Sequence, residues 1–140
     1  MNLDARSAPG PIELVLPANS ANAVVVRIVA ATLAAHLDYS LDRVDDLRII
    51  ADEFFSLVID HAQPDEPVIL QLAIVGSGTT HMVHLHSHGA THQTSTTLDG
   101  DLRWTLLTAL ANDVILRIHD GAFDFDVDVA AVSQIPRPDD

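Results

Sequence analysis

The sequence predicts an α+β fold, a two-layer sandwich in which helices cover one face of a mixed, mostly antiparallel β-sheet. Three stretches carry apolar residues at three- and four-residue intervals, which is the periodicity of a helix, and five shorter ones alternate apolar and polar residues, as strands do. The order along the chain is strand, helix, helix, two strands, loop, helix and two strands. Because neighbouring strands in this order can pair as hairpins, the helices are free to share one face.

Composition limits the classes of protein to consider. The chain has 140 residues and no cysteine, and we expect a flexible leader over residues 1–11, a single domain over residues 12–130 and a tail over residues 131–140. No apolar run approaches the ~20 residues of a membrane span and no signal segment is visible, so no membrane contact and a cytoplasmic location are expected. The net charge of −13 disfavours direct nucleic-acid binding, which depends on Lys and Arg, and favours a basic protein partner.

The first half of the chain is predicted as one strand followed by two helices. The strand covers residues 12–16, and a helix follows over residues 20–37. This helix is apolar nearly all round, so one side should be buried and the other should contact a neighbouring helix or a partner. Ser40 caps the second helix, which ends near residue 62. Its apolar residues form one stripe, made of Val44, Leu47, Ala51, Phe54, Phe55, Val58 and Ala62.

The second half is predicted as two hairpins separated by a polar loop and a helix. Gly76 and Gly78 can supply positive φ angles in the first turn, and Asp120-Gly121 is a hairpin signal in the second. Trp104 on the helix is expected to lie in the core. The elements are strands 68–75 and 81–87, loop 88–100, helix 101–111, and strands 114–119 and 123–129.

Two segments carry a family pattern. DEFFSLVIDHA in the second helix matches the pattern D-E-x-x-x-N-x-x-x-H-A at Asp52, Glu53, His61 and Ala62, and LLTALANDVILRIHDG matches a later helix-to-strand pattern, L-x-x-A-L-A-D-x-V. Over residues 12–129 the chain resembles the bacterial anti-sigma-factor serine kinases of the histidine-kinase and Hsp90-like (GHKL) ATPase superfamily. The resemblance implies the HATPase-like (Bergerat) fold, an ATP site and a role in transcription regulation.

The same resemblance shows where this chain departs from the family. The asparagine that ligates magnesium in the family falls at Leu57, whose alkyl group has no lone pair for a hard cation. The D-x-G-x-G box that holds adenine falls on residues 87–91, and the glycine-rich phosphate lid falls on residues 100–103, where Asp101 is expected to repel phosphates. The family's general base maps onto Glu53. The resemblance thus implies a vestigial nucleotide pocket made of Glu53, Leu57, Ser87, Gly89, Thr91, Gly100, Asp101 and Arg103.

A cluster of histidines on one predicted strand has the spacing of a possible metal site. His84, His86 and His88 would project from one face at roughly 7 Å spacing, where they could hold zinc or nickel. However, the chain has no cysteine, and the next carboxylate in the sequence is Asp99. We therefore predict no metal site, and these three residues are only weak candidates for one. We expect them to face solvent or a pH-sensitive interface.

The sequence favours a regulatory protein that binds a sigma factor, an anti-anti-sigma antagonist of the STAS type, or both, and a homodimer is compatible with the resemblance. No cofactor is expected, and ATP with Mg²⁺ would bind only if the degenerate pocket still functions. An active ATP-dependent serine kinase that uses Glu53 is the first alternative, so enzymatic activity stays open, although Leu57 argues against it. A histidine-rich metal-binding protein is the second alternative.

Overall fold

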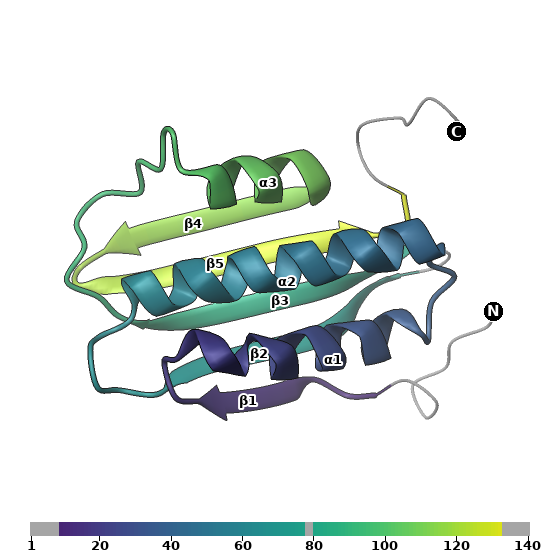
Figure 1. Cartoon of the computed structure of the whole chain (residues 1–140), viewed down its shortest axis with the longest axis horizontal. Coiled ribbons are helices and arrows are strands. Elements are labelled where there is room, and N and C mark those ends of the chain that lie inside the picture. Colours follow the sequence, from purple (N-terminus) through teal and green to yellow (C-terminus); the bar gives the residue numbers. More distant parts are fainter. Residues whose placement is uncertain (1–8, 78–79, 133–140) are drawn as a thin grey trace.

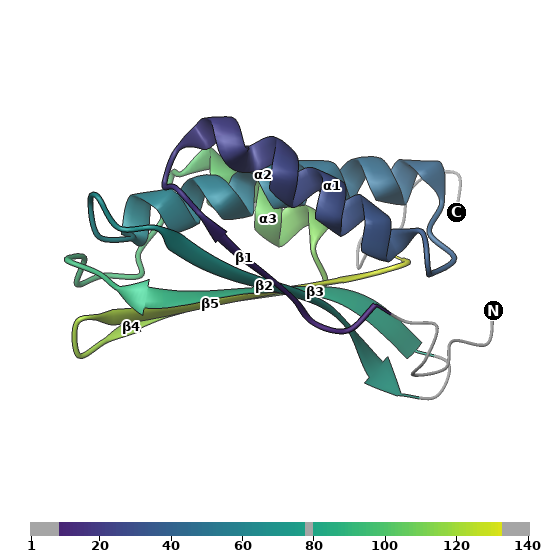
Figure 2. The same cartoon turned by 90° about the horizontal axis from the view of Figure 1, so that it is seen from below.

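The computed structural model describes residues 9–77 and 80–132. Five strands form one sheet in the order β1-β2-β3-β5-β4, and every pairing is antiparallel. The helices lie on one face of this sheet, as Figures 1 and 2 show. The elements are β1 (Ile12–Leu16), α1 (Ala23–Ala34), α2 (Leu41–His61), β2 (Val68–Ser77), β3 (Thr80–Ala90), α3 (Leu102–Leu110), β4 (Asp113–His119) and β5 (Ala122–Ala130). The predicted α+β sandwich is confirmed, with an entirely antiparallel sheet in place of a mixed one.

Local sequence signals account for the ends of most elements. Ser40 caps α2, because its Oγ accepts a hydrogen bond from the Arg43 backbone amide at 3.1 Å. The expected helix over residues 20–37 is shorter than predicted and consists of a 3-10 turn, Ser20–Asn22, followed by α1. The β4–β5 turn has φ angles of 55° at Asp120 and 75° at Gly121, as a two-residue hairpin turn requires. The expectations for residues 1–8, Gly78 and residues 133–140 lie outside the described residues.

The core lies between the helices and the sheet, with α2 running over β3 and β5 (Figure 1). The rings of Phe54 on α2 and Phe125 on β5 stack at a centroid distance of 4.8 Å. Trp104 on α3 packs beside them at 6.4 Å from the Phe125 ring, as expected for a core residue. The Tyr39 hydroxyl donates to Val129 O and accepts from the Val83 amide, so it ties the α1–α2 connection to the middle of the sheet.

The sheet face opposite the helices carries no described helix (Figure 2). Strand alternation sends the apolar side chains of β5 into the core, so its aspartates point to the open face. None of the described helices has both the length and the apolar composition of a membrane span.

Candidate functional site

Arg103, in the first turn of α3, joins α3 to α2. Its Nε and Nη2 donate to the two carboxylate oxygens of Asp101 at 3.0 and 2.7 Å, a two-point contact. Its Nη1 donates to Ser56 Oγ at 3.0 Å and to Asp60 Oδ2 at 2.5 Å, both on α2. The hydrogen bond from Arg103 lowers the pKa of Asp101, and the same bond raises the pKa of Arg103. The guanidinium of Arg103 therefore offsets much of the negative charge of Asp101, which the sequence places where it would repel phosphates.

Asp101 also begins α3. Its Oδ1 accepts from the Arg103 backbone amide at 2.9 Å, which makes it the N-cap. The preceding residue, Gly100, has a φ of 81°, a conformation that glycine adopts at little cost. These two positions, predicted as remnants of a phosphate lid, fix the start of a helix. Among residues 100–103, only Arg103 has a side chain that could bind a phosphate, and Asp101 holds it.

Glu53 lies on α2 near this contact and is partly buried. Burial is the main cause that raises its pKa, and the negative charges of Asp52 and Asp101 raise it further, while the positive charge of Arg103 lowers it. A carboxylate with a raised pKa is a better proton acceptor, which is a property that a general base needs.

Leu57 is fully buried, with 0% of its surface exposed, and belongs to the apolar core. Its backbone oxygen accepts a hydrogen bond from His61 Nδ1 at 2.7 Å, and the His61 ring lies 6.1 Å from the ring of Phe123 on β5. Side chains at this part of α2 therefore pack against the sheet. A buried alkyl group cannot contribute a ligand to Mg²⁺.

The positions matched to the adenine-binding box lie at the end of β3 and just beyond it. Ser87 is fully buried, and its hydroxyl donates a hydrogen bond at 2.8 Å to the backbone oxygen of Ile69 on β2. A Cβ atom at Gly89 would meet Phe123 Cε1 at 3.3 Å, and Thr91 is buried. Ser87 and Gly89 line a cavity of about 110 Å³, well below the ~300–1,000 Å³ of most small-molecule sites.

The structure thus divides the predicted pocket residues into two groups. Glu53, Asp101 and Arg103 lie close enough to influence one another's charge, next to Gly100, whereas Ser87 and Gly89 line the small cavity. Sequence reasoning missed Ser56 and Asp60, which hold Arg103. Their four-residue spacing places them on one face of α2, and this spacing is the feature of the sequence that could have identified them as a pair.

The amino-acid sequence is similar to that of a known anti-sigma factor. No family model matches it. The chain is 31% identical over 110 residues to the anti-sigma-F factor RsbW of two strains of Mycobacterium tuberculosis, CDC 1551 / Oshkosh and ATCC 25618 / H37Rv. The match covers 79% of this chain, and the chain spans 62% of the length of those relatives.

A solved structure agrees with this finding at the level of the fold. The crystal structure of the RsbU and RsbW domains of Rv1364c from Mycobacterium tuberculosis matches 86% of this chain and 32% of that chain with a TM-score of 0.63. Their identity is 15%, so this likeness concerns the fold alone. The match of 31% identity shows that this chain is homologous to the anti-sigma-F factor RsbW over 110 residues, as its resemblance to the anti-sigma-factor kinases indicated.

Proposed function

We propose that this protein is an anti-sigma regulator that binds a sigma factor, an anti-anti-sigma antagonist of the STAS type, or both, with little or no binding of ATP. The observation that carries the proposal is the homology to an anti-sigma-F factor over 110 residues. The net charge of −13 is consistent with attraction of a basic partner surface. A homodimer, as the resemblance implies, is part of the proposal.

The weak ATP binding in this proposal is supported by the chemistry of the pocket positions. Leu57 has no atom that could bind Mg²⁺ and is fully buried. The Ser87 hydroxyl already donates to Ile69 O, and a serine lacks the carboxylate that would accept from the adenine amino group. The Arg103 guanidinium is held by Asp101 and Asp60, so it is engaged by two carboxylates.

One feature favours the alternative of a serine kinase, namely the partly buried position of Glu53, which raises the pKa of its carboxyl group. A general base contributes to phosphoryl transfer only where nucleotide, metal and acceptor are already positioned. The remaining pocket positions offer no such arrangement, so the regulator without nucleotide-dependent activity is the better-supported function.

The proposal is tested with the full chain and the sigma factors and STAS-type proteins encoded near its gene. Each mixture is separated by size-exclusion chromatography with light scattering, with and without Mg-ATP. We expect a stable complex with at least one candidate, equal in yield under both conditions, and a dimer mass for the chain alone. Failure of every candidate to bind would overturn the regulatory role, and a complex formed only with Mg-ATP would overturn its independence from nucleotide.

A further inference from the structure

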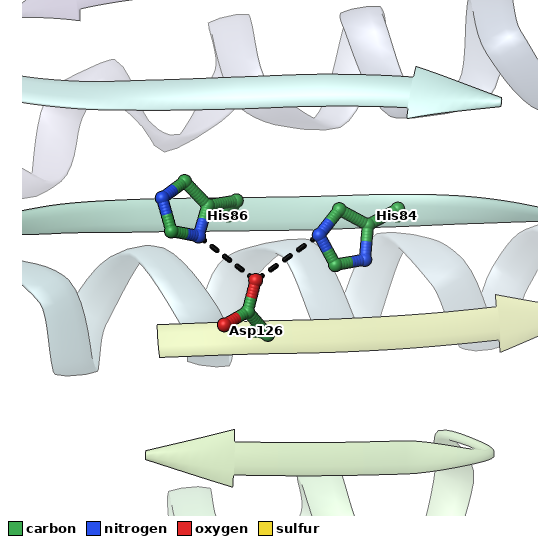
Figure 3. Close-up of side chains that lie close together, drawn as sticks. All are labelled: His84, His86 and Asp126. Carbon is green, nitrogen blue, oxygen red and sulfur yellow. Dashed lines mark hydrogen bonds and ion pairs between the residues drawn. The ribbon is translucent and has the colours of Figure 1, made fainter. Parts of the chain in front are cut away.

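A ladder of histidines faces a ladder of aspartates on the open face of the sheet. β3 and β5 are neighbours, and their register pairs His84 with Asp128, His86 with Asp126 and His88 with Asp124. The sequence-based expectation that these histidines have no carboxylate nearby is therefore wrong. Figure 3 shows His84 and His86 on β3 turned toward Asp126 on β5. This face lies on the other side of the sheet from α2 and α3 (Figure 2), and so from Glu53 and Arg103.

Three ligand atoms converge within this ladder. Asp126 Oδ1 lies 3.1 Å from His84 Nε2 and 2.8 Å from His86 Nδ1, and all three atoms are within 4.8 Å of one another. Tetrahedral zinc with nitrogen and oxygen ligands at ~2.0–2.2 Å separates neighbouring ligand atoms by about 3.3 Å. The two contacts of Asp126 Oδ1 are within about 0.5 Å of this spacing, and the ligand atoms of the two histidines lie within 4.8 Å of each other, so a zinc ion would need only small adjustments of side chains that are already gathered. The three side chains are between 20% and 29% exposed, so a metal ion could enter.

The second nitrogen of each histidine already has a partner that would orient it for a metal. His84 Nδ1 lies 2.5 Å from Asp128 Oδ1, and His86 Nε2 lies 3.0 Å from His88 Nδ1. If these nitrogens carry the ring protons and donate them to Asp128 and His88, the lone pairs of His84 Nε2 and His86 Nδ1 face Asp126. Histidine ligands of metal ions characteristically donate their other N–H in this way, which fixes the tautomer.

Charge also favours a cation here. Both ring nitrogens of His84 face carboxylate oxygens, and a neutral imidazole has one proton to offer. One lone pair is then directed at a carboxylate unless a second proton or a metal ion lies between. Asp124, Asp126 and Asp128 follow one another on this face. Arg117 of β4 lies opposite Asp124, whereas Asp113 of β4 lies opposite Asp128, so like charges adjoin at that end of the ladder. A divalent ion would offset this repulsion.

We propose that His84 Nε2, His86 Nδ1 and an Asp126 carboxylate oxygen bind a divalent transition-metal ion, with Zn²⁺ as the occupant. Two imidazoles and one carboxylate suit zinc, and this set leaves a coordination position for water or for an atom of a partner. Asp128 and His88 are positioning residues that hold the two imidazoles. The site is independent of the proposed anti-sigma function.

The test is a titration of the untagged full chain with zinc chloride in competition with a chromophoric chelator, checked by the absorption of the Co²⁺-loaded protein. We expect one equivalent of zinc to bind and to raise the Tm, and magnesium at the same concentration to do neither. Asp126→Asn, which preserves side-chain size, and His84→Ala should each weaken zinc binding at least tenfold. Asp128→Ala should weaken it by about 10–100-fold through loss of orientation.

The matched control is His119→Ala. His119 lies on the same open face, on β4, and its side chain is 68% exposed and paired with Asp120, outside the cluster. This variant should bind zinc like the parent protein. Circular dichroism of each variant checks that it is folded. If His84→Ala does not fold, the comparison rests on Asp126→Asn. Absence of zinc binding in the parent, or equal loss of affinity in His119→Ala and Asp126→Asn, would overturn the site and indicate scattered binding to surface histidines.

Discussion

Arg43 Nη2 donates a hydrogen bond to Asn112 Oδ1 at 2.7 Å, which joins the first turn of α2 to the chain just after α3. The same guanidinium donates to Leu110 O and to Ala130 O, each at 2.7 Å, and contacts Asp46 Oδ2 at 3.1 Å. Arg43 is only 2% exposed. A buried cation is stable only where its donors are satisfied, so this network fixes how α2, α3 and the end of β5 meet.

We therefore expect Arg43→Ala to lower the free energy of unfolding by about 3–5 kcal/mol, because it removes one partner from a buried ionic network. Arg48→Ala is the matched control. Arg48 is also on α2 and contacts an aspartate three residues away, Asp45, at the same 3.1 Å, but its side chain is 56% exposed. Its loss should change stability by less than about 0.5 kcal/mol. Urea unfolding followed by Trp104 fluorescence measures both, and equal effects would contradict the network.

A second prediction concerns whether Leu57 faces the core or an open pocket. Leu57→Asn places the family's asparagine at a position that is 0% exposed. Burying an amide without a partner and leaving a void should cost at least about 3 kcal/mol, whereas Leu57→Met should cost less than about 1.5 kcal/mol. Thermal and urea unfolding compare the two variants. If Leu57→Asn were as stable as Leu57→Met, the side chain would reach solvent, and the pocket would be open there.

The helices and strands could be predicted from the sequence because their signals are local. Phe54 and Phe55 fall on the apolar stripe of α2, and the Asp120-Gly121 turn identifies its hairpin, so neither inference needs distant contacts. Arg43 could not be recognised in this way. Its partners Asn112 and Ala130 lie 69 and 87 residues away in the sequence, and only the packing of α2 on the sheet brings them together.

The sequence indicates His84 and His86 as candidate metal ligands, but for a similar reason it does not reveal Asp126, the carboxylate of the proposed zinc site. His86 and Asp126 are 40 residues apart, on strands that are not consecutive, and β3 pairs with β5 because β4 takes the edge of the sheet. The alternation that points His84 and His86 to one face was visible, and so was that of Asp124 and Asp126. What the sequence did not reveal was the register that sets one ladder against the other.

The contact between Asp101 and Arg103 predicts a pH dependence of stability. Because the folded state lowers the pKa of Asp101, its stabilising effect is present above the ordinary aspartate range and is lost as the pH falls through the lowered value. Asp101→Asn retains an oxygen for the N-cap, so it should lower stability by about 1 kcal/mol at neutral pH, and the difference should vanish in acid. Urea unfolding from pH 7 to pH 2 tests this, with Asp99→Asn, an exposed neighbour, as control. A difference that persists at pH 2 would contradict it.

For Glu53 we expect the opposite dependence of stability on pH. Its pKa is raised on folding, so the ionised form costs stability, and this cost appears as the pH rises from the ordinary glutamate value through the raised one. Glu53→Gln should therefore gain stability relative to the parent protein over that interval, whereas Glu66→Gln in the exposed α2–β2 loop should not. Carboxyl NMR of Glu53 gives the midpoint directly. This midpoint should rise further in Arg103→Ala, because the positive charge of Arg103 lowers it, and an unchanged midpoint would contradict the coupling.

Nucleotide affinity tests the degenerate pocket as a whole. With an alkyl group at Leu57 and Arg103 held by Asp101 and Asp60, calorimetry should detect no binding of Mg-ATP or Mg-ADP tighter than about millimolar, a free energy of only ~4 kcal/mol. Incubation of the full chain with labelled ATP and a STAS-type protein should transfer no phosphate. Micromolar binding would contradict the loss of the pocket. Phosphate transfer that stops in Glu53→Gln would establish the kinase alternative, because that substitution removes the proton acceptor and keeps the size of the side chain.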